Sequence, residues 1–478
     1  MRKIMKQWTV VVVALMLSVS VFLPEASANA LQQYFEQTVG KGNASVTIES
    51  ASTGQRVLQV NGDVPRQPAS NLKLATGFGA MYMLGNHYRF KTEVYTDGTV
   101  ENGVLKGHVF LKGYGDPTLQ LQDLQSIGQA LKAQGIHKIE GHILGDDSYF
   151  VGPQLSPGVK PYEETEYYAA RVSALTMSPN EDFDAGTIIV EVKPSQVGYK
   201  PLVYQLPGYS NLNIINNSTT TKKGTKNTLS IKRKLGTNDV IISGQLPMGS
   251  SKKEWVTVAD PTVTTLFYAR SAFQKAGIEL GKGSWFWRQS IKPDYKLLYT
   301  HYSRPLGNMY ATFMKLSNNV MADTFLKTLG AERKGIGDFA NGAAAVKEYF
   351  EASYMPMNSM VMVDGSGLSE KNRLTTNELA TFLNKARKTY AFSSYYAGLP
   401  VGGVSDRLIG GTLKNRFQGR YAYHVVAKTG YIDGVYTLSG YVKTRSGNEY
   451  VVSIMTENNR SSKIGSIDQF VKHLIDYY

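Results

Sequence analysis

The sequence contains no cysteine among its 478 residues. This absence excludes a disulfide framework, a thiol nucleophile, a zinc site built on cysteines and a lipid anchor attached to cysteine. The chain also contains no internal repeat and no low-complexity tract. A chain of this length buries adequate cores without cross-links, and at roughly 100–200 residues per domain it predicts two or three domains.

The N-terminus has the pattern of an export signal. Basic residues precede an apolar run from Trp8 to Leu23, and small residues follow at Ala26–Ala28. The run is shorter than the roughly 20 residues of a membrane span, and the small residues predict cleavage after Ala28 or Ala30. We therefore predict a signal peptide over residues 1–28 and a secreted protein at the cell wall or the outer face of the cytoplasmic membrane, or in the periplasm if the cell is Gram-negative. An uncleaved N-terminal anchor is the alternative.

The formal net charge is +14, which predicts attraction to polyanions. Export argues against nucleic acid and favours anionic wall polymers or lipid headgroups as partners. One cluster of basic residues comprises Lys222, Lys223, Lys226, Lys232, Arg233 and Lys234. This cluster predicts docking on anionic wall polymers, and salt would weaken that docking. The alternative is that the cluster is a solvated face of a β-hairpin.

Alternating residues predict a hairpin from Ala44–Glu49 and Arg56–Val60, and the apolar spacing after Ser70 predicts a buried helix. Residues 88–282 change to short β-like runs separated by Gly, Pro, Asn and Ser, with helices at Gln120–Gln134 and Val263–Lys275. We predict that 88–282 is an inserted β-rich region of two subdomains.

The last part of the chain returns to long helices, predicted at Leu306–Leu329 and Gly342–Tyr354. Strands follow, and the chain closes with a helix predicted from Ile467. The apolar residues of this helix form one stripe, which predicts that it packs on a sheet. The strands are predicted at Tyr421–Lys428, Gly434–Lys443 and Glu449–Thr456. Residues 31–87 and 283–478 would then form one α+β catalytic domain around the insertion.

Three short motifs occur in order: Ser70-Asn-Leu-Lys73, Ser317-Asn-Asn319 and Lys428-Thr-Gly430. The first two are weak alone, because Ser-x-x-Lys recurs at Ser250–Lys253 and Ser-x-Asn at Ser178–Asn180. Their order and their predicted secondary structure make the combination specific.

Ser70 and Lys73 lie one turn apart at the start of a helix, within reach of a proton transfer. A serine hydroxyl needs an adjacent base, and lysine is a base only where burial or a second cation destabilises its ammonium. Lys428 is a candidate for that cation. Without its context, Ser70 would be interpreted as an ordinary N-cap.

Lys428 and Thr429 are predicted at the end of a strand, where they would meet a substrate carboxylate, with Gly430 leaving the strand edge open. Ser317 is a candidate relay for the proton of the leaving amine, and Asn319 would hold Lys73 and the peptide amide. A capping or turn pair is the alternative for these two residues.

The motif set resembles the class C low-molecular-mass penicillin-binding proteins, which are D-alanyl-D-alanine carboxypeptidases and endopeptidases. The resemblance covers nearly the whole mature chain, including the long insertion between Ser70 and Ser317. It also rests on Leu111–Leu119, Val172–Thr176, Asn180, Asp364–Ser369, Leu399–Gly403 and Gly411–Asn415.

The resemblance implies a serine β-lactamase/transpeptidase-like α+β core with an antiparallel sheet flanked by helices. It implies acylation of Ser70 with Lys73 as its base, and an oxyanion hole formed by the amides of Ser70 and Tyr431. Peptidoglycan stem peptides would be the substrates, β-lactams would be covalent inhibitors, and no metal or other cofactor would be needed. The Asp364–Ser369 stretch would be a structural loop near the site.

Two departures from the family pattern stand out. The middle motif is Ser-Asn-Asn where relatives often have Ser-Asp-Asn, and Glu163 or Glu164 stands where relatives place an acid near the substrate side chain. Surface glutamates are the alternative for these two. A β-lactamase remains an alternative function, although the Glu-x-x-Leu-Asn pattern of class A enzymes is missing. A non-catalytic β-lactam or wall sensor is a further alternative.

Overall fold

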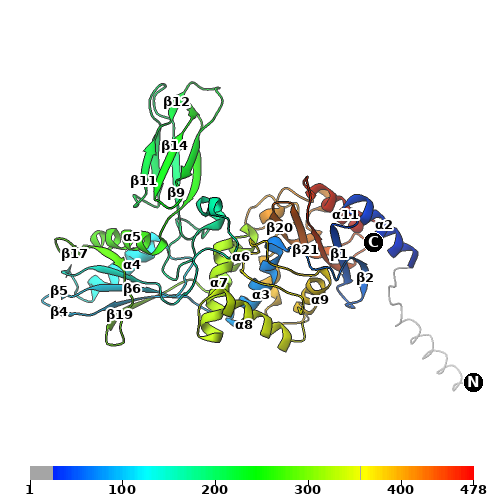
Figure 1. Cartoon of the computed structure of the whole chain (residues 1–478), viewed down its shortest axis with the longest axis horizontal. Helices are drawn as coiled ribbons and strands as arrows, with labels where there is room; N and C mark the ends of the chain where they lie inside the picture. Colours follow the sequence, from blue (N-terminus) through cyan, green and yellow to red (C-terminus); the bar gives the residue numbers. More distant parts are fainter. Residues whose placement is uncertain (1–24, 356) are drawn as a thin grey trace, which may run out of the picture.

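The computed structural model describes residues 25–355 and 357–478. Most of the predicted signal peptide therefore lies outside the described residues. The first described helix, α2 (Glu25–Thr38), buries Leu31 and Phe35, and the Phe35 ring lies 5.0 Å from that of Phe470 in α11 (Ile464–Tyr477). The first and the last described helices thus pack together beside the main sheet (Figure 1). No helix in the described part of the chain is long and apolar enough to cross a membrane.

The main sheet has five antiparallel strands in the order β2-β1-β22-β21-β20. The strands are β1 (Ala44–Ser50), β2 (Arg56–Val60), β20 (Val425–Ile432), β21 (Val435–Lys443) and β22 (Glu449–Thr456). The predicted hairpin and the packing of the C-terminal helix are confirmed, since α2 and α11 share one hydrophobic core with the sheet. Strand β20 forms one edge of the sheet.

Helices cover the other face of the sheet and enclose α3 (Figure 1). The short helix η1 (Ala69–Asn71) leads directly into α3 (Leu72–Met83), which is apolar on nearly all sides and buried from Leu72 to Met81. The Phe78 ring of α3 lies 5.1 Å from Phe382 and 5.4 Å from Tyr395. The surrounding helices are α6 (Leu306–Leu316), α7 (Asn319–Lys334), α8 (Phe339–Ala352), α9 (Thr376–Ala386) and α10 (Phe392–Gly398).

The prediction of one helix over Leu306–Leu329 was wrong. Helix α6 ends at Leu316, because Ser317 adopts a left-handed conformation with φ of 60°. The Asn318 side chain then accepts a hydrogen bond from the Met321 amide and begins α7. Asparagine competes with a continuous helix by capping a new one.

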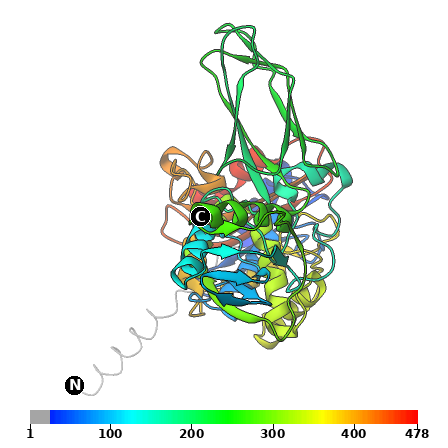
Figure 2. The same ribbon diagram turned by 90° about the vertical axis from the view of Figure 1, so that its left-hand side faces the viewer.

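The inserted region contains two bodies, which Figures 1 and 2 show as a lower lobe and a projecting β-lobe. In the lower lobe, α4 (Leu121–Ala133) and α5 (Pro261–Lys275) cover two sheets, ordered β18-β8-β6-β3-β19 and β17-β7-β5-β4. Its strands are β3 (Lys91–Thr96), β4 (Thr99–Glu101), β5 (Val104–Lys106), β6 (Val109–Gly113), β7 (Lys138–Ile139), β8 (Ile143–Asp146), β17 (Glu279–Leu280), β18 (Phe286–Arg288) and β19 (Lys296–Tyr302).

The projecting lobe consists of three small sheets, ordered β10-β9-β16, β11-β14-β13 and β12-β15. Its strands are β9 (Thr187–Lys193), β10 (Leu202–Leu206), β11 (Asn213–Asn216), β12 (Thr219–Thr221), β13 (Ser230–Arg233), β14 (Asp239–Ser243), β15 (Gln245–Pro247) and β16 (Lys252–Thr257). Both helices predicted within residues 88–282 are present, as α4 and α5.

The sequence prediction ended the insertion at residue 282, but two later strands belong to its sheets. Strand β18 pairs with β8, and β19 pairs with β3 along its full length. We therefore propose that the insertion ends after Tyr302. The period-2 pattern in Lys296–Tyr302 is weak, which is why the sequence did not reveal this strand.

Candidate active site

The three motifs meet where the edge strand β20 lies against η1 and the junction of α6 and α7. The site lies between the sheet and the helical half of the domain, so its residues come from both (Figure 1). A buried asparagine joins the two halves. The Asn71 amide, in the orientation that satisfies both its ends, donates to the Lys428 carbonyl at 2.9 Å and accepts from the Ser439 hydroxyl at 2.6 Å.

Lys73 is fully buried, and its ammonium has three hydrogen-bond partners. Its Nζ lies 2.9 Å from Ser70 Oγ and donates to Asn319 Oδ1 at 2.6 Å and to the Ser366 carbonyl at 2.7 Å. All three acceptors are neutral. The hydroxyl of Ser70 therefore lies in direct contact with a lysine that no carboxylate touches.

Burial lowers the Lys73 pKa to about 7, while the negative charges of Asp323 and Asp364 oppose this shift. Burial also lowers the pKa of Lys428 well below its ordinary value, with repulsion from Lys73 as the second cause. The sequence analysis expected burial or a second cation to destabilise the Lys73 ammonium, with Lys428 as the candidate cation. In the structure, burial is the main cause of the Lys73 shift.

Lys428 is as buried as Lys73, and its Nζ donates to Ser317 Oγ at 2.8 Å. The left-handed conformation of Ser317 turns this hydroxyl from the end of α6 toward β20. Ser317 and Lys428 thus form a second hydroxyl–ammonium pair beside Ser70 and Lys73. Lys428 also donates to the carbonyl of Thr429 at 2.8 Å.

Asn319 joins Lys73 to the insertion, because its Nδ2 donates to the Tyr168 carbonyl at 2.9 Å. Thr429 Oγ1 donates to Thr412 Oγ1 at 2.7 Å. A methyl group added to Gly430 would lie 3.0 Å from the Ser70 amide nitrogen, so β20 approaches η1 closely here. The Tyr431 side chain is exposed. The structure therefore brings all the motif residues together.

The two candidate glutamates have local partners instead. Glu164 lies 3.3 Å from Arg171 and 3.2 Å from Arg233, and Glu163 accepts from the Lys160 amide at 2.7 Å, which caps the short helix η2 (Pro161–Thr165). Recognition of a substrate side chain by Glu163 or Glu164 stays a prediction.

Arg233 corrects the predicted basic cluster. It is only 4% exposed and donates to the Thr237 carbonyl at 2.6 Å as well as to Glu164, so it is not a surface residue. The five lysines of the cluster are exposed, but Lys232 and Lys234 flank Arg233, whereas Lys222, Lys223 and Lys226 lie in the segment between β12 and β13. Strand β12, which leads into this segment, stands at the tip of the projecting lobe (Figure 1).

Sequence reasoning missed four residues that support the site: Asn71, Tyr168, Thr412 and Asp323. It expected Asp364–Ser369 to be a structural loop near the site, but not the contact of the Ser366 carbonyl with Lys73. Asp323 follows Asn319 by four residues in α7, and this spacing was the available signal. The contribution of a backbone carbonyl has no signal in the sequence. Among the described residues, no group of three or more His, Asp or Glu is arranged to hold a metal ion.

Comparison with known proteins gives a consistent set of matches. The family model described as D-Ala-D-Ala carboxypeptidase 3 (S13) matches residues 27–474. The D-alanyl-D-alanine carboxypeptidase of Actinomadura sp. strain R39 is 33% identical, over 87% of this chain and 78% of that protein. The D-alanyl-D-alanine carboxypeptidase DacB of Haemophilus influenzae is 24% identical, over 91% of this chain and 89% of that protein.

Among solved structures, penicillin binding protein 4 (dacB) from Haemophilus influenzae aligns over 93% of this chain and 98% of that chain. The TM-score is 0.78 at 21% sequence identity. This likeness confirms the predicted α+β fold, including the presence of the large insertion.

Proposed function

Because the chain belongs to the D-Ala-D-Ala carboxypeptidase 3 (S13) family, we propose that it is a serine DD-peptidase of peptidoglycan. Its substrates are stem peptides that end in D-alanyl-D-alanine, D-alanyl cross-links, or both, and β-lactams acylate the same serine. The observation that carries the proposal is the 2.9 Å contact between Ser70 Oγ and the Nζ of a buried lysine whose pKa is about 7. Such a lysine is an effective base at neutral pH.

In the acylation step, Ser70 Oγ attacks the carbonyl carbon between the two D-alanine residues, and neutral Lys73 accepts the hydroxyl proton. The amides of Ser70 and Tyr431 stabilise the oxyanion that forms. When the C–N bond breaks, the leaving amine takes a proton from the Ser317 hydroxyl. The adjacent Lys428 then donates a proton to Ser317. A Ser70 ester and a free amine result.

Before the second step, the proton that Lys73 took from Ser70 passes to Lys428, which replaces the proton that Lys428 gave through Ser317, so Lys73 is neutral again. A water molecule then attacks the ester, and Lys73 accepts one proton of the water. The C–O bond to Ser70 breaks, Ser70 takes this proton from Lys73, and the shortened peptide loses its acid proton to solvent and leaves as a carboxylate. Lys428 and Thr429 bind the substrate carboxylate, and Asn319 contacts its peptide amide.

We also propose that the protein is exported, because the N-terminal sequence has the pattern of a cleaved signal. At the wall, the tip lysines, defined as Lys222, Lys223 and Lys226, would contact anionic polymers. Their exposure and common sign of charge support this role, and Arg233 has no part in it. Attraction of this kind depends on ionic strength.

The test compares the mature wild-type protein with Ser70→Ala and Ser250→Ala. Ser250 belongs to the second Ser-x-x-Lys pattern of the chain, in a turn of the insertion, and is the matched control. Each protein is incubated with a fluorescent penicillin and with a D-Ala-D-Ala peptide, and protein label and free D-alanine are measured. We expect stable label and D-alanine release from the wild type and from Ser250→Ala, and neither from Ser70→Ala.

The other outcomes separate the alternatives. Label without release of D-alanine indicates a sensor or an enzyme restricted to cross-links, and a cross-linked dimer substrate distinguishes these two. Rapid loss of label indicates a β-lactamase. An unlabelled wild-type protein, or a labelled Ser70→Ala variant, contradicts the assignment of Ser70.

A further inference from the structure

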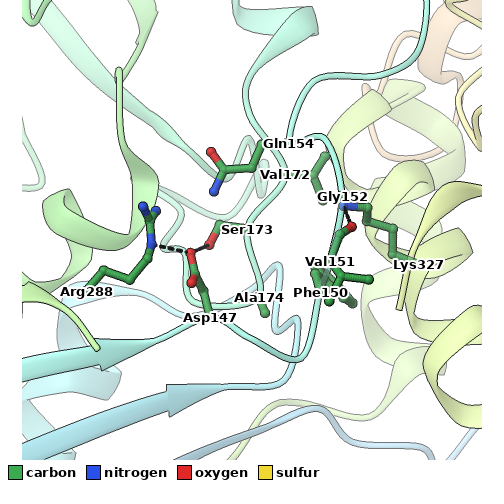
Figure 3. A pocket seen from close by; sticks show the side chains of 10 residues that line it. All are labelled: Asp147, Phe150, Val151, Gly152, Gln154, Val172, Ser173, Ala174, Arg288 and Lys327. Atoms are coloured by element: carbon green, nitrogen blue, oxygen red, sulfur yellow. Dashed lines mark hydrogen bonds and ion pairs between the residues drawn. The ribbon is translucent and has the colours of Figure 1, made fainter. Parts of the chain in front are cut away.

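One face of α7 links the inserted region to the site. Asn319, Asp323 and Lys327 follow one another at intervals of four residues, so their side chains leave the helix on the same side. Asn319 contacts Lys73, whereas Lys327 donates to the carbonyls of Val151 at 3.1 Å and Pro153 at 2.9 Å in the insertion. Figure 3 shows Lys327 reaching this loop beside a cavity of about 270 Å³.

Asp323, in the middle of this row, is 1% exposed and has a partner on each side. Its Oδ1 accepts from the Gly365 amide at 2.8 Å, and its Oδ2 accepts from the Ser156 hydroxyl. Ser156 belongs to the same loop of the insertion that Lys327 contacts. Asp323 therefore joins the insertion to the Asp364–Ser369 loop.

The Asp364–Ser369 loop is fixed by several further hydrogen bonds. Asp364 accepts from the amides of Gly367 and Ser369, both at 2.7 Å, and Thr76 of α3 donates to the Gly365 carbonyl at 2.7 Å. These contacts leave the Ser366 carbonyl directed at Lys73 Nζ, 2.7 Å away. A small shift of this loop would remove one of the three acceptors around Lys73.

The charges near Lys73 are few and all buried. The carboxyl groups of Asp323 and Asp364 lie near it without contacting it, and Lys428 and Lys327 are further buried groups that can carry charge. Burial raises the pKa of Asp323 to about 7 and also raises that of Asp364, so Asp323 carries its negative charge at neutral pH and above. In a buried region, a charge that makes no contact still stabilises an opposite charge nearby. The charge of Asp323 therefore acts on the proton of Lys73 through space.

We propose that Asp323 is a positioning residue of the acylation step: it fixes the loop that presents the Ser366 carbonyl to Lys73, its negative charge stabilises protonated Lys73, and Ser156 of the insertion holds it in place. The inference rests on the proposed function, because it assumes that neutral Lys73 is the base. It assigns the insertion a part in the chemistry as well as in the architecture.

The experiment measures the second-order rate constant of acylation by a fluorescent penicillin from pH 5 to pH 9 in the full-length mature protein. Asp323→Asn is the main variant, because an asparagine can accept from Gly365 and donate to Ser156 while it lacks the charge. We expect the midpoint of the acid limb to move to lower pH by up to about 1 unit, since Lys73 loses a carboxylate whose negative charge stabilises its ammonium. The rates of the two proteins should differ most near pH 7 and converge well below it, where Asp323 of the wild type is protonated as well.

Two further variants complete the test. Ser156→Ala removes a hydrogen bond that favours the charged form of Asp323, so we expect a smaller shift in the same direction. Asp338→Asn is the matched control, because Asp338 caps α8 and asparagine caps equally well. Its acid limb should coincide with that of the wild type.

An acid limb that stays in place in Asp323→Asn, or moves to higher pH, overturns the proposal. A fall in rate at every pH without a shift of the limb means that Asp323 only supports the fold. If Asp323→Asn does not fold in a thermal-unfolding control, Ser156→Ala decides by the same criterion. A wild-type protein that is not acylated refutes the proposed function itself, whereas an acylated wild type with unmoved variants refutes only this inference.

Discussion

A single methyl group at Gly430 should separate the two halves of the active site. Gly430 pairs with Thr437 across β20 and β21, and an added Cβ would fall closer than 3.0 Å to Thr437 Oγ1. The same Cβ would lie 3.0 Å from the Pro68 carbonyl and from the Ser70 amide nitrogen. The clash would therefore occur directly at the backbone that carries the nucleophile.

The magnitude of the effect follows from how the clash is relieved. Thr437 is 2% exposed and donates to the Pro68 carbonyl at 3.0 Å, so its rotation would leave a buried hydroxyl and carbonyl without partners. Otherwise β20 must withdraw from η1. Overpacking of this kind costs about 1–3 kcal/mol in the free energy of unfolding. A displacement of about 1 Å between Ser70 and the groups on β20 would lower the acylation rate about 100-fold.

The assay measures acylation by a fluorescent penicillin and the free energy of unfolding for Gly430→Ala. Gly465→Ala is the control, because Gly465 is exposed in α11 and an added Cβ has no neighbour within 4 Å. This control should acylate at the wild-type rate and be equally stable or slightly more stable. A second substitution, Thr437→Ala, should partly restore acylation to Gly430→Ala by removing the clashing atom. Wild-type acylation by Gly430→Ala would refute the close approach of β20 to Ser70.

Two further predictions concern charge. Burial lowers the Lys73 pKa to about 7, and the base must be neutral. The wild-type acylation rate should therefore fall about tenfold per pH unit below pH 7 and level off above it. A rate that is constant down to pH 5 would contradict this role of Lys73. Replacing the tip lysines by glutamate should weaken retention of the protein on isolated walls at low ionic strength. Retention at high ionic strength and the rate of acylation should not change. Undiminished retention at low ionic strength would exclude these residues as a docking surface.

The sequence predicted the site more completely than its physical basis. Ser70, Lys73 and Lys428 could be identified because short motifs in a fixed order are visible in one chain. The reason for Gly430 could not, since the approach of β20 to η1 joins segments that are more than 350 residues apart (430 − 70 = 360). We expected this glycine to leave the strand edge open, and the structure indicates that it also allows contact with the Ser70 backbone.

The fold shows the same division. Periodicity predicted the hairpin, α3 and α11, because each has one clear apolar pattern. It failed at Ser317, where one left-handed residue and one capping asparagine divide an apolar stretch into two helices. It also failed for β19, whose residues are largely half-exposed and whose place is fixed by pairing with the distant β3. Local patterns predict elements, whereas nonlocal pairing sets domain limits.

The burial of Lys73 and Lys428 explains why the site needs so many supporting contacts. Two buried ammonium groups are costly unless each is hydrogen-bonded and balanced by charge. Their hydrogen bonds come from four separate segments: η1 with α3, the α6–α7 junction, the Asp364–Ser369 loop and β20 itself. The balancing carboxylates, Asp323 and Asp364, are themselves fixed by backbone amides. A change that loosens any one segment should therefore raise the proton affinity of Lys73 by admitting water, and reactivity should fall before the protein unfolds.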